Sequence, residues 1–141
     1  WADPYRFGNN NQCPDAFPWN IRLLYRTENE QIRSLLEIKN FYLLHEKLSY
    51  LEGIEIYDSG YALGDIKPVQ MYIDIGIKNM HSKNFNEKAN LIRQLAKTIY
   101  NFAIEIGISK SVTLEAMCLY CTDHNSPEYK NLLIEVQNIS K

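Results

Sequence analysis

Residues 84–107 constrain the fold most, because they carry the clearest periodic pattern in the sequence. Their apolar residues recur at intervals of three and four, which places them on one face of an α-helix. Asn84 or Asn86 can accept hydrogen bonds from the first free backbone amides, and Glu87 suits the positive end of the helix dipole. Gly107 is typical of a left-handed helix end. We therefore predict a core helix over this segment.

Three segments carry strand patterns. Residues 69–77 alternate apolar and polar side chains, as a strand with one buried face does. Residues 54–56 alternate in the same way, and residues 58–68 supply the Gly, Asp and Pro residues of a long hairpin connection. Alternation in residues 19–26 predicts a first strand.

The remaining segments leave two alternatives open. Residues 27–30 form a capping box, and a helical pattern follows to Leu51 with a break at residues 39–40. One kinked helix ending at Gly53 and a helical hairpin both fit, and we favour the single helix because no second repeat unit is present. Residues 112–120 fit a strand or a short helix, and we favour the strand.

A helix closes the predicted order, because Ser126, Pro127 and Glu128 are a helix start and an apolar stripe follows. The order is strand, helix, strand, strand, helix, strand, helix. We predict an α+β fold in which a mainly antiparallel sheet of about four strands packs under two long helices, in the ferredoxin-like order, with an added C-terminal helix. An all-α fold is the main alternative.

Composition limits the classes of partner. The chain has 141 residues, of which 45% are hydrophobic and 23% charged, so we expect one globular domain over residues 19–141. The formal net charge of -2 and the absence of a basic run argue against nucleic acid as a partner. No apolar run reaches the roughly 20 residues that span a bilayer, so we expect no transmembrane segment.

Residues 1–18 hold three prolines and three consecutive asparagines without any period, and we interpret them as an irregular N-terminal arm. The chain begins at Trp1 rather than Met, for which a removed signal peptide is one explanation. We expect a periplasmic or secreted protein, with the cytoplasm as the alternative.

The three cysteines are Cys13, Cys118 and Cys121. We favour a disulfide from Cys13 to Cys118 or Cys121, which closes a loop of about 105 residues and restricts the unfolded chain by about 4 to 5 kcal/mol. A redox CxxC site is disfavoured because no helix follows the pair. A zinc site that adds His124 is disfavoured because Leu119 and Tyr120 are core-like residues. Buried free thiols are expected if the protein is cytoplasmic.

No motif in the sequence supports catalysis. His45 and Glu46 begin a metalloprotease pattern, but Ser49 stands where its second histidine belongs. The sequence has no glycine-rich phosphate loop and indicates no metal or other cofactor. An enzyme is therefore disfavoured but stays open.

Tyrosine is unusually frequent, with ten residues, and several fall outside the apolar stripes. Exposed tyrosines suit a recognition surface, because each provides a large contact area at low entropic cost. The predicted hairpin would bring tyrosines and aspartates together, and we predict there a protein-binding surface formed by Tyr57, Asp58, Tyr61, Asp65, Tyr72 and Asp74.

These patterns favour a non-enzymatic, extracytoplasmic protein-binding domain, either an immunity or inhibitor protein or an accessory subunit of an envelope system. The expected partner is another protein. The alternative is a small enzyme or small-ligand binder with a cleft between sheet and helices.

Overall fold

A computed structural model describes residues 19–25, 38–63, 69–120 and 126–139, without the side chains of 24–25, 38–39, 41, 58–63, 69–72, 118 and 120. The elements are β1 (Asn20–Tyr25), α2 (Ile38–Ser49), β2 (Ile54–Leu63), β3 (Val69–Ile77), the 3-10 turn η1 (Met80–Ser82), α3 (Phe85–Glu105), α4 (Lys110–Ala116), β4 (Met117–Tyr120) and α5 (Pro127–Gln137). The predicted mixed α+β class is confirmed, and the all-α alternative is wrong.

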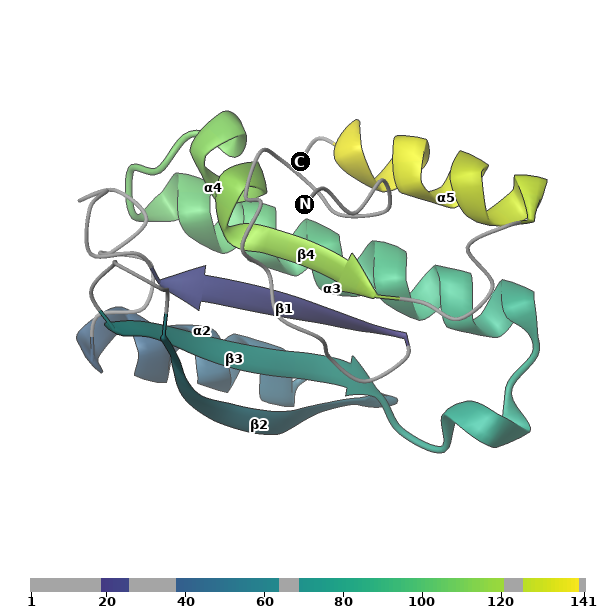
Figure 1. The fold of residues 1–141 in the computed structure, drawn as a ribbon, viewed down its shortest axis with the longest axis horizontal. Coiled ribbons are helices and arrows are strands. Elements are labelled where there is room, and N and C mark those ends of the chain that lie inside the picture. The colour runs from purple at the N-terminus through teal and green to yellow at the C-terminus, as the bar shows by residue number, and fades with distance from the viewer. Residues whose placement is uncertain (1–18, 26–37, 64–68, 121–125, 140–141) are drawn as a thin grey trace.

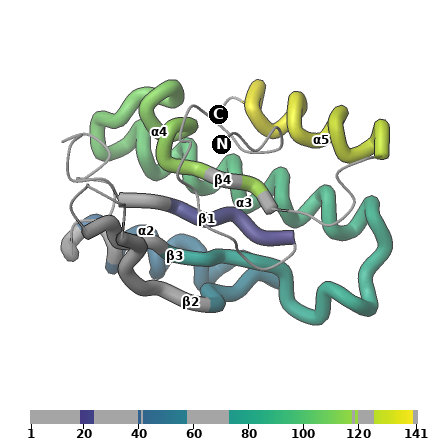
Figure 2. Tube along the Cα trace, in the orientation of Figure 1, coloured from purple at the N-terminus to yellow at the C-terminus, as the bar shows by residue number. Residues whose placement is uncertain are grey.

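The described strands pair antiparallel in the order β2-β3-β1-β4, which leaves β2 and β4 as the two edges. In Figure 1, α2 and α3 lie behind the sheet. Figure 2 shows α5 beyond β4, with β2 at the opposite side of the sheet. The surface around β2 is therefore well separated from α5.

Strand alternation divides the sheet into two different faces. The isoleucines and leucines of β1 and β3 that face the helices are fully buried. The residues between them, Asn20 and Arg22 on β1 and Asp74 on β3, point to the other face and are also buried. The apolar face belongs to a core formed by Ile21, Leu23, Ile73, Ile75 and Ile77 of the sheet with Leu44, Leu48, Ile92, Leu95, Ile99 and Phe102 of the helices.

Helix α3 has the predicted boundaries for the predicted reasons. The Asn84 side chain accepts a hydrogen bond from the Glu87 backbone N–H, and the Glu87 carboxylate accepts one from the Asn84 N–H. At the other end Gly107 has φ +90°, and Ile108 donates its N–H to the Ala103 carbonyl. Both ends of the core helix are thus specified by local sequence.

Three boundaries differ from prediction. Strand β2 continues through residues 58–60, where a turn was expected, because a β-bulge after Ile56 restores pairing with β3. Residues 110–116 are helical because the Ser109 side chain caps α4, so only β4 remains of the strand predicted at 112–120. Helix α2 runs unbroken through residues 39–40, and the capping box at 27–30 lies outside the described residues.

An aromatic cluster joins β1 to the helices. Trp19 is buried, with its ring centroid 5.7 Å from that of Phe85 and 5.3 Å from that of Tyr129. The Lys88 ammonium lies 4.7 Å from the Trp19 ring centroid, a cation–π distance. Trp19 has φ 57°, a left-handed conformation unusual for this residue type. Packing against α3 and α5 therefore holds the start of β1 in place.

The Tyr100→Phe substitution tests a buried hydroxyl on α3. The Tyr100 hydroxyl has no hydrogen-bond partner among the described residues, and burial raises the pKa of Tyr100 above its usual value. Removing an unpaired buried hydroxyl should leave stability at pH 7 unchanged or raise it by about 1 kcal/mol in urea denaturation.

The dependence of stability on pH above about 10 provides a second result for the same substitution. Burial raises the pKa of Tyr100 in the folded chain, so above about pH 10 the unfolded chain releases this proton first. The part of the free energy of unfolding that depends on the neutral Tyr100 is therefore complete below about pH 10 and is lost at higher pH. The Tyr100→Phe chain should therefore lose stability less steeply above pH 10. A cost above about 1.5 kcal/mol at pH 7 would instead mean that the hydroxyl makes a productive hydrogen bond.

Candidate functional site

The predicted hairpin exists as strands β2 and β3, which bring five of the six predicted surface residues into two adjacent strands. Asp58 pairs with Asp74 and Gly60 with Tyr72, while Tyr61 pairs with Met71. The side chains of Asp58, Tyr61 and Tyr72 are not described, and Asp65 lies outside the described residues. Tyr57 and Asp74 are therefore the predicted site residues whose side chains can be placed.

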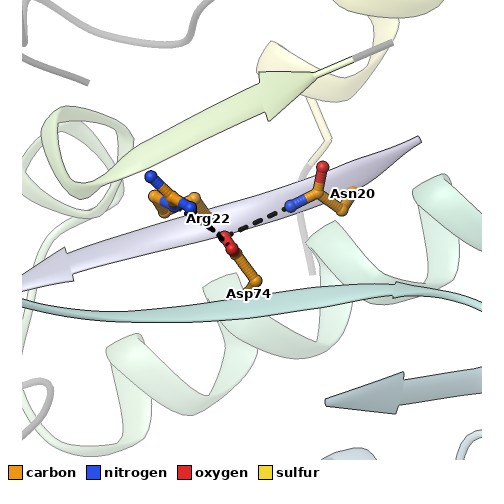
Figure 3. Close-up of polar contacts among 3 residues, drawn as sticks. All are labelled: Asn20, Arg22 and Asp74. Atoms are coloured by element: carbon orange, nitrogen blue, oxygen red, sulfur yellow. Dashed lines mark hydrogen bonds and ion pairs between the residues drawn. The ribbon is translucent and has the colours of Figure 1, made fainter. Parts of the chain in front are cut away.

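Asp74 was predicted as a surface residue, and this is wrong: its side chain is 1% exposed. Its register partner in β1 is Arg22, and the two form a bidentate pair, with Nε to Oδ1 and Nη2 to Oδ2 both 2.6 Å. The Asn20 amide also donates to Oδ1, at 3.2 Å (Figure 3). Both carboxylate oxygens of Asp74 are thus occupied within the sheet, and it does not present its charge to a partner.

The polar cluster of Asn20, Arg22 and Asp74 has a structural role. A buried charge that loses its partner is strongly destabilising, so the two charges have to stay together. Arg22 escaped prediction because it and Asn20 are the two polar residues in an otherwise apolar strand. A signal was present, however: Arg22 and Asp74 both stand out of phase with the apolar residues of their strands.

Tyr57 occupies the bulge of β2, and its ring lies across Gly76. A Cβ at Gly76 would lie 2.2 Å from Tyr57 Cε2, so only glycine leaves room for the ring. The Tyr57 hydroxyl donates to the Ile77 carbonyl. Partial burial, and secondly the charge of Glu55, raise the pKa of Tyr57. Tyr57 as a whole is 37% exposed, so it remains partly open to solvent.

Among the described strands, β2 has one unpaired edge, which we call the free edge of β2 and which begins beside this tyrosine. The Lys78 N–H donates to the Gly53 carbonyl at 2.9 Å, which makes Gly53 and Lys78 a hydrogen-bonded pair. In an antiparallel ladder such pairs alternate with pairs whose backbone groups point away from each other. Ile54 pairs with Ile77 and Ile56 with Ile75, so the N–H and C=O groups of Ile54 and Ile56 point outward from the sheet.

A hollow of about 260 Å³ lies next to this edge, between α2 and β2. Its apolar walls are Leu48, Ile54 and Ile56. Small-ligand pockets usually measure about 300–1,000 Å³, so this space is better matched to a single side chain. We call it the α2/β2 hollow, and its lining is completed by the polar residues His45, Ser49, Glu55 and Lys78.

Two further tyrosines are exposed on α2 and just after its end. Tyr42 on α2 is 67% exposed, and Tyr50, one residue beyond α2, is 78% exposed. Neither was part of the predicted surface. The helical period of α2 could have identified them, because both lie off the stripe that contains the buried Leu44 and Leu48.

The predicted cysteine chemistry stays untested. Cys118 lies in β4 as the register partner of Arg22, while Cys13, Cys121 and His124 lie outside the described residues. In the part of the chain that is described, no three His, Cys, Asp or Glu side chains gather as metal ligands would. None of the helices described is long and apolar enough to cross a bilayer.

Comparison with known proteins found no family model that matches the sequence, no similar curated protein and no similar solved structure. Function is therefore argued from the geometry of the α2–β2 region: an open strand edge, a hollow of side-chain size and exposed tyrosines.

The Asp74→Asn substitution tests the polar cluster. It removes the Asp74 charge from its bidentate pair with the buried Arg22 guanidinium and should cost about 3–5 kcal/mol in urea denaturation. Glu135→Gln is the matched control, because it breaks the exposed Arg93–Glu135 pair, which should contribute less than about 1 kcal/mol. Equal costs for the two substitutions would contradict the structural role given to Asp74.

The Gly76→Ala substitution tests the position of Tyr57. The new methyl displaces the Tyr57 ring and should cost about 1–3 kcal/mol. In a Tyr57→Ala background the same change should cost clearly less, because the ring is gone and only the Asn20 Cβ, 3.2 Å from the new methyl, stays close. Denaturation of all four chains gives the coupling energy, and an equal cost in both backgrounds would refute the contact.

Proposed function

We propose that this chain is a non-enzymatic protein-binding domain that works outside the cytoplasm, as an immunity or inhibitor protein or as an accessory subunit of an envelope system. The observation that carries the proposal is the exposure of three tyrosines, Tyr42, Tyr50 and Tyr57, within the single α2–β2 unit. Tyrosine is enriched at protein interfaces, where its large ring and hydroxyl contribute apolar contact and hydrogen bonding together.

The remaining predicted surface residues, Asp58, Tyr61, Asp65 and Tyr72, extend the proposed surface along β2, β3 and their connection. Extracytoplasmic placement depends on the proposed disulfide from Cys13 to Cys118 or Cys121, which requires an oxidising compartment. We also propose the four-stranded ferredoxin-like arrangement, for which the antiparallel strand order β2-β3-β1-β4 is the support.

A small enzyme or small-ligand binder is the second candidate, because His45, Ser49 and Glu55 line the α2/β2 hollow together. Two observations weigh against it. The Ser49 hydroxyl donates to the Glu46 carbonyl at 2.6 Å, so its proton is already engaged, and the hollow is small for a ligand.

Site-specific photo-crosslinking tests the protein-binding function. A photoreactive phenylalanine analogue is placed at Tyr50 or Tyr57, and the chain is irradiated in an extract of its native host. We expect one protein to crosslink stoichiometrically from these positions. The control is the same analogue at Ile134 on α5, an exposed apolar residue beyond the other edge of the sheet.

The expected protein should crosslink weakly or not at all from Ile134. Equal crosslinking from all three positions would mean nonspecific contact, and an extract that yields no crosslinked protein from Tyr50 or Tyr57 would refute the proposed surface.

A further inference from the structure

We propose that the α2–β2 unit binds its partner by strand addition: an extended segment of the partner protein pairs with the free edge of β2 and places one apolar side chain in the α2/β2 hollow. This inference rests on the proposed protein-binding function and specifies its mode. Its first support is the backbone, because the outward N–H and C=O groups of Ile54 and Ile56 are those that an added strand requires.

The hollow provides the second support. In strand addition the backbone gives affinity and pockets for alternate side chains give specificity. Ile54 and Ile56 supply both the outward backbone groups and the apolar wall, which Leu48 of α2 completes. A side chain that projects from an added strand toward α2 would therefore enter a space already lined with apolar groups.

The charged rim of the hollow indicates which residues should stand on either side of the apolar residue in the bound segment. Glu55 on β2 and Lys78, one residue after β3, line it, and both are exposed. The structure shows no ion pair for either of them within the ranges it describes. A segment with polar or charged residues on both sides of its apolar residue would meet the Glu55 carboxylate and the Lys78 ammonium at this rim. The rim therefore favours an amphipathic extended peptide over a uniformly apolar one.

A second copy of the chain fits this edge less well. The antiparallel register that uses the outward groups of both Ile54 and Ile56 in each copy places Glu55 directly opposite Glu55. Like charges in directly opposed positions destabilise a strand pair. The bulge after Ile56 also ends the regular edge, so the two copies could not extend their pairing to compensate. We therefore assign the edge to a segment of a different protein.

Two substitutions at one residue separate the backbone from the side chain. Ile56→Pro removes an N–H that points away from β3, so the sheet keeps its own hydrogen bonds. Ile56→Ala is the matched control, because it shortens the same side chain and keeps the N–H. Each chain is tested against a phage-displayed library of linear twelve-residue peptides, and selected peptides are then synthesised for affinity measurement.

We expect the unsubstituted chain to select peptides with one apolar residue between polar ones. Their affinity should fall about tenfold or more for Ile56→Pro relative to Ile56→Ala, since a hydrogen bond is lost and the proline ring obstructs the edge. Intermolecular nuclear Overhauser effects between the peptide backbone and the Ile56 amide of the unsubstituted chain give a second result that does not depend on the variants folding.

Several outcomes would overturn the inference: no selected peptides, equal affinity for the two variants, or no Overhauser effects at Ile56. Dimers of the unsubstituted chain that Ile56→Pro dissociates would assign the edge to a second copy instead. If the photo-crosslinked protein binds both Ile56 variants equally, strand addition is refuted while the protein-binding function stands. If nothing crosslinks from Tyr50 or Tyr57, it is the function that is refuted.

Discussion

The buried ion pair between Arg22 and Asp74 is the interaction on which the rest of the structure depends. It lies on the sheet face away from α2 and α3, with two contacts of 2.6 Å between the guanidinium and the carboxylate. A shift of β1 by one residue would turn Arg22 into the apolar core, which is prohibitively costly without a partner. The pair therefore fixes the register of β1 on β3, and the isoleucines of both strands face the helices as a consequence.

That register also separates the polar cluster from the proposed recognition surface. With the pair in the middle of the sheet, the charges of Arg22 and Asp74 are buried and paired with each other. The β2 edge keeps accessible groups, because Tyr57 lies across Gly76 and the backbone N–H and C=O groups of Ile54 and Ile56 point outward from the sheet. The scaffold and the proposed recognition surface thus occupy different parts of the same sheet.

Local signals account for what could be predicted from the sequence. Helix α3 follows from its capping box and Gly107, and β3 from its alternation. The alternating pattern of β3 could not show that Asp74 is buried. A polar residue in such a strand is exposed or buried according to its neighbour on the adjacent strand, and for Asp74 this neighbour is Arg22. Strand β2 passes through Asp58, Ser59 and Gly60 because pairing with β3 overrides their turn preference. The α2/β2 hollow forms only where α2 and β2 pack side by side, so the sequence of neither segment could predict it.

Amide hydrogen exchange of the free chain tests directly whether β2 offers an open edge. The Ile54 and Ile56 amides should exchange quickly, because they point away from the sheet, while the Glu55 amide, which faces β3 in a hydrogen-bonded pair, should be protected. Protection of Ile54 and Ile56 equal to that of Glu55 would show that the edge is already covered in the free protein, and would contradict the account.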